Sequence, residues 1–276
     1  MNETQSERLE LLVEAFKADS GVYRNLETPP DTDGRRRLLR SLMNVRPPRA
    51  LDAETLRVQD AYLKDRAAEL GVIDVQTIPT VEQSLGSKKP HADVLSIWQG
   101  DITRLKCDAI VNAANSEMLG CFRPMHTCID NCIHTYAGVQ LRLECAEKMD
   151  ALRRVHGQRY TQPTAVPMLT EGYNLPARKV VHIVGPIVED ALTPALEADL
   201  AACYRNTLDL CAEQGLKTVA FCCISTGVFR FPPDRAAEIA VETVTNWISE
   251  HPDRMERVIF NVHQEKNRTR YEALLA

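Results

Sequence analysis

Two cysteines and one histidine occur within eight residues in the segment G-C-F-R-P-M-H-T-C-I-D, residues 120–130. Thiolate sulfur and imidazole nitrogen are donors that zinc favours in proteins. Three ligands, Cys121, His126 and Cys128, leave the fourth position of a tetrahedral zinc open, as in catalytic rather than structural sites. The C-x4-H-x-C spacing is not a common zinc-finger pattern. The alternative interpretation is a packed histidine, and Cys132 is a possible competing ligand.

Asparagines follow an expected strand in the sequence V-N-A-A-N-S, which contains Asn112 and Asn115. Asparagine offers both donors and acceptors and tolerates unusual backbone angles, so such a loop suits the hydroxyl groups of a sugar. An ordinary turn is the alternative explanation for either residue. A shorter polar turn, G-D-I, precedes this loop in the chain.

A third segment, S-T-G-V-F-R-F-P-P at residues 225–233, follows a strongly apolar expected strand and precedes an expected helix that opens at Pro233. A glycine-containing turn before a helix presents backbone N–H groups to an anion such as a phosphate. Taken alone, the segment is equally compatible with an ordinary strand-to-helix connection.

The elements that would position these residues alternate between strands and helices after residue 90. Runs rich in valine and isoleucine predict strands at 94–98, 109–112, 165–169, 179–184, 218–224 and 257–262. Helices are expected at 129–149, 195–214 and 233–249, the first because apolar residues recur at every fourth position. This alternation predicts a mostly parallel sheet with helices on both faces. Ligands of such sheets bind beyond the carboxyl ends of the strands.

Before residue 90, three amphipathic segments at 6–19, 34–43 and 52–70 predict helices, and pairs of prolines separate them. We interpret residues 1–90 as an N-terminal helical extension with a linker at 84–90, and residues 91–276 as the main domain. The extension carries no motif that predicts chemistry, so we expect it to be a helical cap.

The composition, 44% hydrophobic and 26% charged, is typical of a chain that can bury a full core. The formal net charge of -5 argues against broad binding of nucleic acids through their phosphates. No secretory signal is expected, and no apolar run approaches the ~18 residues of a membrane span. We expect a cytoplasmic protein, or also a nuclear one in a eukaryote. Its nine cysteines then indicate thiols and metal ligands rather than disulfides.

Together these segments resemble the macrodomain family, whose fold binds ADP-ribose. The resemblance rests on G-D-I, V-N-A-A-N-S, G-Y-N-L-P-A (172–177), V-H-I-V-G-P (181–186) and S-T-G-V-F-R-F-P (225–232). The segment G-C-F-x-P-x-H-x-C-I-D-N-C-I-H resembles the zinc-dependent branch of the family, and the helical extension is also similar to that branch. The resemblance implies a three-layer α/β/α fold with a mixed, mostly parallel central sheet.

The resemblance also implies roles in ligand binding. Asp101 would accept a hydrogen bond from the adenine amino group, with the backbone of Ile102 beside it. Asn112 and Asn115 would shape the loop around the distal ribose, Asn115 in more direct contact. The diphosphate would bind mainly to backbone N–H groups of Ser225, Thr226, Gly227, Val228 and Phe229, with the Phe229 ring over the distal ribose.

On the same basis, Cys121, His126 and Cys128 would hold one zinc ion beside the distal ribose. Asp130 matches the aspartate of the G-G-V-D stretch that other hydrolytic members carry, and would either position a hydroxyl or water or cap the helix. Asn115 and Asp130 are therefore the candidate catalytic residues. Gly185 and Pro186 would shape the pocket wall, and we expect His134 and His182 to be structural.

The implied activity is zinc-dependent hydrolysis of mono-ADP-ribose from modified proteins, with zinc as a Lewis acid on the ribose or on water. Microbial members of the branch are associated with sirtuin-type ADP-ribosyltransferases and lipoylated carrier proteins, which makes these the expected partners. Two alternatives stay open: a reader module that binds ADP-ribosylated proteins without cleavage, and a hydrolase of small ADP-ribose derivatives such as the O-acetyl ester. The acidic net charge disfavours a third, a nucleic-acid-binding protein with a structural zinc.

Overall fold

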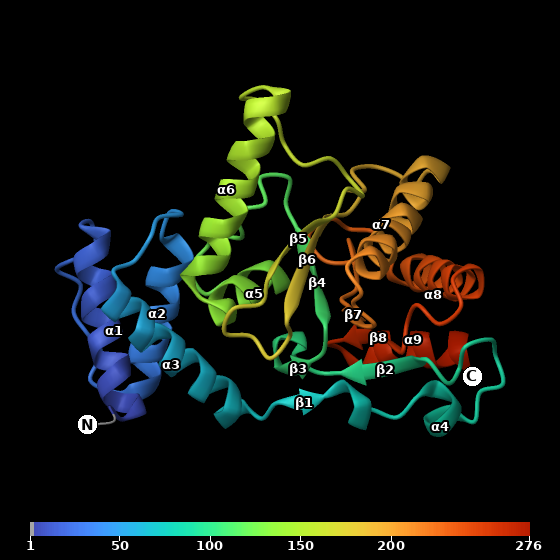
Figure 1. Cartoon of the computed structure of the whole chain (residues 1–276), viewed down its shortest axis with the longest axis horizontal. Helices are drawn as coiled ribbons and strands as arrows, with labels where there is room; N and C mark the ends of the chain where they lie inside the picture. Colours follow the sequence, from blue (N-terminus) through green and yellow to red (C-terminus); the bar gives the residue numbers. More distant parts are fainter. Residues whose placement is uncertain (1–2) are drawn as a thin grey trace. The chain divides into compact units, whose positions relative to one another are not determined.

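The computed structural model of the chain describes residues 3–276 and forms two compact units (Figure 1). The first unit contains the chain through Gly71 together with Glu117–Tyr160 and Tyr173–Leu175. The second contains Val72–Ser116, Thr161–Gly172 and Pro176–Ala276. The sequence pattern predicts a division at residue 90, which stays a prediction. The two compact units have different boundaries. The N-terminal helices share a unit with the Cys–His–Cys segment.

The first unit is helical. Its helices are α1 (Gln5–Ser20), α2 (Thr32–Val45), α3 (Ala53–Leu70), α5 (Ile129–Ala137) and α6 (Val139–His156). The three helices predicted before residue 90 are confirmed. The single helix predicted over 129–149 is wrong, because Gly138 adopts a φ of +97° and separates α5 from α6. Glycine populates this conformation without the steric cost that other residues would meet.

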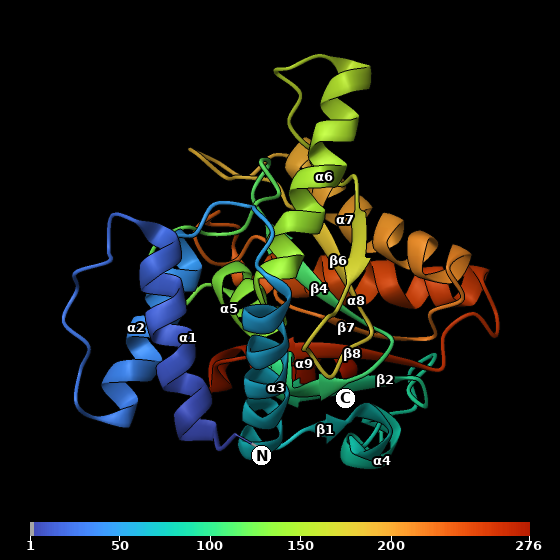
Figure 2. The same cartoon turned by 60° about the vertical axis from the view of Figure 1, so that its left-hand side comes forward.

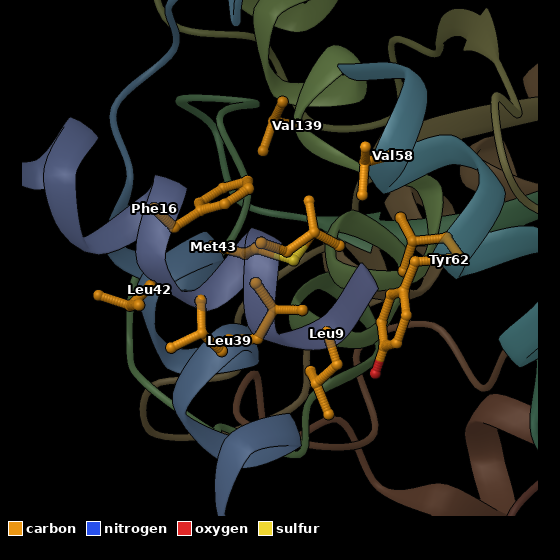
Figure 3. Packing of buried hydrophobic residues seen from close by; sticks show 11 residues of the cluster. Leu9, Phe16, Leu39, Leu42, Met43, Val58, Tyr62 and Val139 are labelled. Carbon is orange, nitrogen blue, oxygen red and sulfur yellow. The ribbon is translucent and has the colours of Figure 1, made fainter. Parts of the chain in front are cut away.

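The core of the first unit forms where α1 packs beside both α2 and α3 (Figure 2). Phe16 of α1, Met43 of α2 and Tyr62 of α3 belong to one buried apolar cluster, which Val139 of α6 joins (Figure 3). The helix starts are capped by Thr4, Asp31 and Asp52, whose side chains accept backbone N–H groups of the first turn. Burial of these faces is what holds the extension together.

The second unit contains the sheet. Its strands are β1 (Ile73–Asp74), β2 (Leu95–Gln99), β3 (Leu105–Lys106), β4 (Ala109–Ala114), β5 (Met168–Glu171), β6 (Lys179–Val184), β7 (Thr218–Phe221) and β8 (Arg257–Val262). Its helices are α4 (Val81–Leu85), α7 (Pro194–Glu213), α8 (Pro233–Glu250) and α9 (Glu265–Leu275), with 3-10 turns η1 (Val75–Thr77) and η2 (Ile102–Arg104).

The main sheet has the strand order β2-β8-β7-β4-β6-β5. All neighbours are parallel except β5, which runs antiparallel to β6. The expected three-layer α/β/α class with a mixed, mostly parallel sheet is confirmed. The central strand β4 is apolar over its first half, and Ala109, Ile110 and Val111 are fully buried, as expected for a strand covered on both faces.

The parallel strands bring their carboxyl ends to one edge of the sheet. Asp101 follows β2, Asn115 follows β4, Gly185 follows β6, and residues 225–229 come shortly after β7. The edge is therefore where the predicted binding residues of this unit gather. Within residues 3–276, no helix combines the length and the apolar character needed to cross a membrane.

Candidate functional site

Three side chains suited to metal binding meet in the first unit. The ligating atoms of Cys121, His126 and Cys128 all lie within 4.8 Å of one another, and the Cys121 sulfur is 3.6 Å from Nδ1 of His126. A tetrahedral zinc, with Zn–S near 2.3 Å and Zn–N near 2.1 Å, holds such a pair of atoms about 3.5 Å apart. The donor set and its spacing fit zinc, and all three residues are partly exposed. They can therefore be reached from solvent.

Cys128 occupies the N-cap of α5, and its sulfur accepts a hydrogen bond from the backbone N–H of Asn131 at 3.4 Å. Burial, with smaller contributions from the neighbouring Cys121 and Asp130, raises the pKa of the Cys128 thiol to about 12 despite this hydrogen bond. A cation between the two sulfurs would favour the thiolate, the form that binds metal. A divalent metal at these ligands would therefore offset the effect of burial on the Cys128 thiol.

The loop that carries these ligands depends on Gly120. Its φ is +81°, and a Cβ atom there would lie 2.8 Å from carbons of the His134 ring. Only glycine combines this backbone angle with such a close approach. Cys132, the possible competing ligand, is outside the group of three, and its sulfur lies 3.6 Å from a guanidinium nitrogen of Arg40.

Asp130 lies in the first turn of α5 and is 5% exposed. Its carboxylate is 3.5 Å from Nε2 of His134, which is also buried. The structure therefore places this candidate catalytic carboxylate against a histidine of its own helix. Its role in positioning a hydroxyl or water stays a prediction.

The polar residues that hold the metal-binding segment were not singled out in the sequence. Asn131 is fully buried and donates its side-chain N–H groups to the backbone oxygens of Cys121 and Arg123. The one local indication of the role of Asn131 is the position of its amide side chain, three residues after the candidate ligand Cys128. Arg40, which donates to Asn131, lies 91 residues away in sequence and has no such signal.

At the sheet edge of the second unit, Asp101 caps the η2 turn. Its Oδ1 accepts from the backbone N–H of Thr103 at 3.0 Å and from the Thr103 hydroxyl at 2.7 Å. Ile102 is buried in the same turn. The turn fixes the position of the Asp101 carboxylate, and its predicted contact with adenine stays a prediction.

The two asparagines of V-N-A-A-N-S have different surroundings. Asn112 lies inside β4, is fully buried, and its Nδ2 is 3.0 Å from Nδ1 of His182 on β6. Because this amide nitrogen can only donate, Nδ1 accepts, which leaves Nε2 of His182 to donate to Thr170 Oγ1 at 3.0 Å. Asn115 follows the strand and is partly exposed. Asn115 is thus the residue of the pair with access to a ligand.

The loop after β7 presents a row of backbone donors. Phe231 N–H donates to the oxygen of Ser225 and Arg230 N–H donates to the oxygen of Gly227, both at 3.0 Å. Within residues 3–276, no acceptor is present for the backbone N–H groups of Gly227, Val228 and Phe229. Successive unpaired N–H donors on such a turn are suited to binding an anion.

Ser225 begins this loop with a φ of 62° and is 5% exposed. Its hydroxyl oxygen has no hydrogen-bond partner among residues 3–276. A Cβ atom on Gly185, the residue after β6, would lie 2.1 Å from this oxygen. Gly185 is therefore required for the close approach of the two loops.

Comparison with known proteins gives a consistent result. Residues 111–240 match the Macro domain family. Over 273 residues the chain is 45% identical to a protein of Treponema medium named protein-ADP-ribose hydrolase, covering 99% of this chain and 100% of that protein. It is 42% identical to the protein of the same name from Staphylococcus aureus strain MRSA252, covering 96% of this chain and 94% of that protein.

Among solved structures, the chain is similar to the Trypanosoma brucei macrodomain in complex with ADP-ribose. The TM-score is 0.65 with 27% sequence identity, covering 91% of this chain and 97% of that chain. The fold, the loops at the carboxyl edge of the sheet and these sequence identities agree. This chain belongs to the macrodomain family.

Proposed function

We propose that this protein is a hydrolase that removes mono-ADP-ribose from modified proteins, and that a zinc ion held by Cys121, His126 and Cys128 takes part in the reaction. The observation that carries the proposal is the convergence of these two sulfurs and one imidazole nitrogen within 4.8 Å. Recognition of ADP-ribose alone requires no such donors. The names of the Treponema medium and Staphylococcus aureus relatives support the same activity.

The loops at the sheet edge would bind the nucleotide. The unpaired N–H groups of Gly227, Val228 and Phe229 suit a diphosphate, which needs several donors and gains from not having to reorganise them. Asp101 would accept from the adenine amino group, and Asn115 would hydrogen-bond the distal ribose. Contacts with the adenine and the diphosphate would position the reacting carbon of the distal ribose for attack, which would lower the entropic part of the activation barrier.

The bond broken joins the anomeric carbon of the distal ribose to a protein side chain. Water adds its hydroxyl group to that carbon, and the side chain leaves with a proton. When bound by the three ligands, zinc would supply Lewis-acid chemistry and positive charge. The Cys128 sulfur at the N-cap of α5 accepts from the Asn131 backbone N–H, which would help to hold it as a ligand. Asp130, whose carboxylate lies 3.5 Å from Nε2 of His134, would orient a hydroxyl or water.

The proposed substrates are mono-ADP-ribosylated proteins. The resemblance to the zinc-dependent branch adds two expected partners, a lipoylated carrier protein and a sirtuin-type ADP-ribosyltransferase, which stay predictions. A cytoplasmic location fits such partners and stays a prediction too.

The test compares release of ADP-ribose from a mono-ADP-ribosylated protein by the wild type and by the variants His126→Ala and Cys128→Ala. We expect both variants to lose release while free ADP-ribose, measured by calorimetry, still binds. Wild-type rates in both variants would contradict a role for zinc. A wild type that binds ADP-ribose but releases none would indicate a reader module, and turnover of O-acetyl-ADP-ribose alone would indicate a small-molecule hydrolase.

A further inference from the structure

The main chain around the metal ligands, residues 119–128, is held by side chains that are not themselves ligands. We call this segment the metal-binding loop. It has no helix or strand, and Met125 within it adopts a positive φ of 55°. A loop of this kind keeps one conformation only if other groups hold it. Such groups are therefore candidates for setting how well the site binds metal.

Asn131 contacts two of the three ligand residues. Its side-chain nitrogen donates to the Cys121 oxygen at 3.3 Å and the Arg123 oxygen at 2.9 Å, and its backbone N–H donates to the Cys128 sulfur at 3.4 Å. Asn131 itself is fully buried, which limits the access of water to these bonds. One residue thus fixes the first and the last ligand of the loop with respect to each other.

Arg40 of α2 links the remaining ligand to this arrangement. One guanidinium nitrogen, Nη2, donates to the His126 oxygen at 2.8 Å and to Oδ1 of Asn131 at 2.9 Å. The second bond also fixes which way the Asn131 amide faces, because Oδ1 accepts from Arg40 and the amide nitrogen must point at the loop carbonyls. The three ligand residues are thereby connected through two side chains.

Two further buried residues support the same loop. Asn44 of α2 accepts from the Met125 backbone N–H at 3.0 Å and donates to Thr135 at 2.9 Å. Arg142 of α6 donates to the Leu119 oxygen at 2.8 Å and to backbone oxygens at the end of α2, including that of Met43 at 3.1 Å. Helix α2 is therefore bonded to the loop directly and through α6.

We propose that Asn131 and Arg40 are positioning residues for the metal, and that helix α2 of the N-terminal extension is a working part of the metal site. The proposal rests on the proposed function, since it assumes that the three ligands bind zinc. Without these bonds the loop samples more conformations. Metal binding must then select the one in which all three donors converge, which weakens affinity.

The test measures zinc affinity by competition with a chromogenic chelator, at a temperature where circular dichroism shows each variant folded. We expect Arg40→Ala to bind zinc about 10- to 100-fold more weakly than the wild type, the usual size for groups that orient metal ligands. Arg40→Lys keeps a charged donor and should recover part of this loss. The matched control is Arg37→Ala, an exposed arginine of the same helix, which should bind zinc like the wild type.

A second readout is the absorption of the cobalt-substituted protein, which reports the geometry of the sulfur ligands. We expect Arg40→Ala to alter this spectrum, and Asn131→Asp, which keeps the acceptor for Arg40 but loses the donors to Cys121 and Arg123, to alter it as well. Wild-type zinc affinity and an unchanged spectrum in both variants would overturn the proposal. If the wild type bound no zinc, the proposed function would fail with it. If the wild type depended on zinc for activity and both variants kept wild-type zinc affinity and an unchanged spectrum, this inference would be wrong and the proposed function would stand.

Discussion

The Cys121 sulfur lies 3.6 Å from Nδ1 of His126, with the Cys128 sulfur within 4.8 Å of both. Cys121 and His126 come from an irregular loop and Cys128 from the N-cap of α5, so the group depends on how the loop meets the helix. The positions of the Cys121 and Cys128 sulfurs suit metal binding, whereas the neighbouring Cys132 is outside the group of ligands.

The two cysteines nearest in sequence at this helix start should therefore differ in their effect on metal content. Cys128→Ser replaces a soft thiolate with a hydroxyl that binds zinc poorly, so purified protein should lose its zinc. Cys132→Ser should keep one zinc per chain, because that sulfur is outside the ligand group. Elemental analysis of the two purified variants checks this. Equal zinc content in both would mean that the ligand assignment is wrong.

Two glycines of the sheet edge should respond differently to a methyl group. At Gly227 a Cβ meets nothing within 4 Å, so Gly227→Ala should change the free energy of unfolding by less than about 0.5 kcal/mol. The methyl group would nevertheless obstruct a diphosphate on the backbone donors. We expect ADP-ribose affinity to fall about tenfold, ~1.4 kcal/mol.

At Gly185 the added Cβ would lie 2.1 Å from the Ser225 hydroxyl, so Gly185→Ala should lower both stability, by about 1–3 kcal/mol, and ADP-ribose affinity. Urea unfolding and calorimetry separate the two effects. Unchanged affinity in Gly227→Ala would argue against phosphate binding at this loop.

Acid should destabilise the sheet unit partly through Asp108. Burial raises the pKa of its carboxyl, but hydrogen bonds from the backbone N–H groups of Lys217 and Thr218 and from Arg178 outweigh this, so the pKa is lowered. A group with a lowered folded-state pKa stabilises the fold above its unfolded pKa, about 3.9 for aspartate. That contribution is lost as pH falls through the folded pKa.

The wild type should accordingly lose more stability between pH 7 and pH 3 than Asp108→Asn, in which this charge is absent at both values. Asp190→Asn, the same change at an exposed position, should follow the wild type. Urea unfolding at the two pH values gives the comparison. Identical pH dependence in all three proteins would show that Asp108 does not contribute.

Local sequence patterns were enough for most of the sheet and for the metal ligands. Runs of apolar residues predict buried strands such as β4. The three candidate metal ligands lie within eight residues, so the sequence shows their types and their spacing together.

The differences between prediction and structure have local causes. The helix predicted over 129–149 is interrupted at Gly138. The strand predicted over 165–169 begins at Met168, after Ala165 with its positive φ of 61°, and the strand predicted over 218–224 ends at Phe221. The sequence pattern does not predict α9, because this helix is highly polar and its buried residues are Tyr271 and Leu275.

The support of the metal-binding loop could not have been predicted in this way. Arg40 meets Asn131 across 91 residues, and Asn44 meets Met125 across 81. Such pairs depend on how α2 packs against α5, which no periodicity in either segment specifies. Similarly, nothing in V-N-A-A-N-S distinguishes Asn112, turned into the sheet toward His182, from Asn115 at the strand end.

The most direct measurement is ADP-ribose release from a mono-ADP-ribosylated protein by the wild type before and after its metal is removed with a chelator, followed by addition of one equivalent of zinc. We predict that the metal-free protein stays folded and binds ADP-ribose but releases none from the substrate, and that one zinc per chain restores release. Full release by the metal-free protein, with zinc content shown to be nil, would contradict the account.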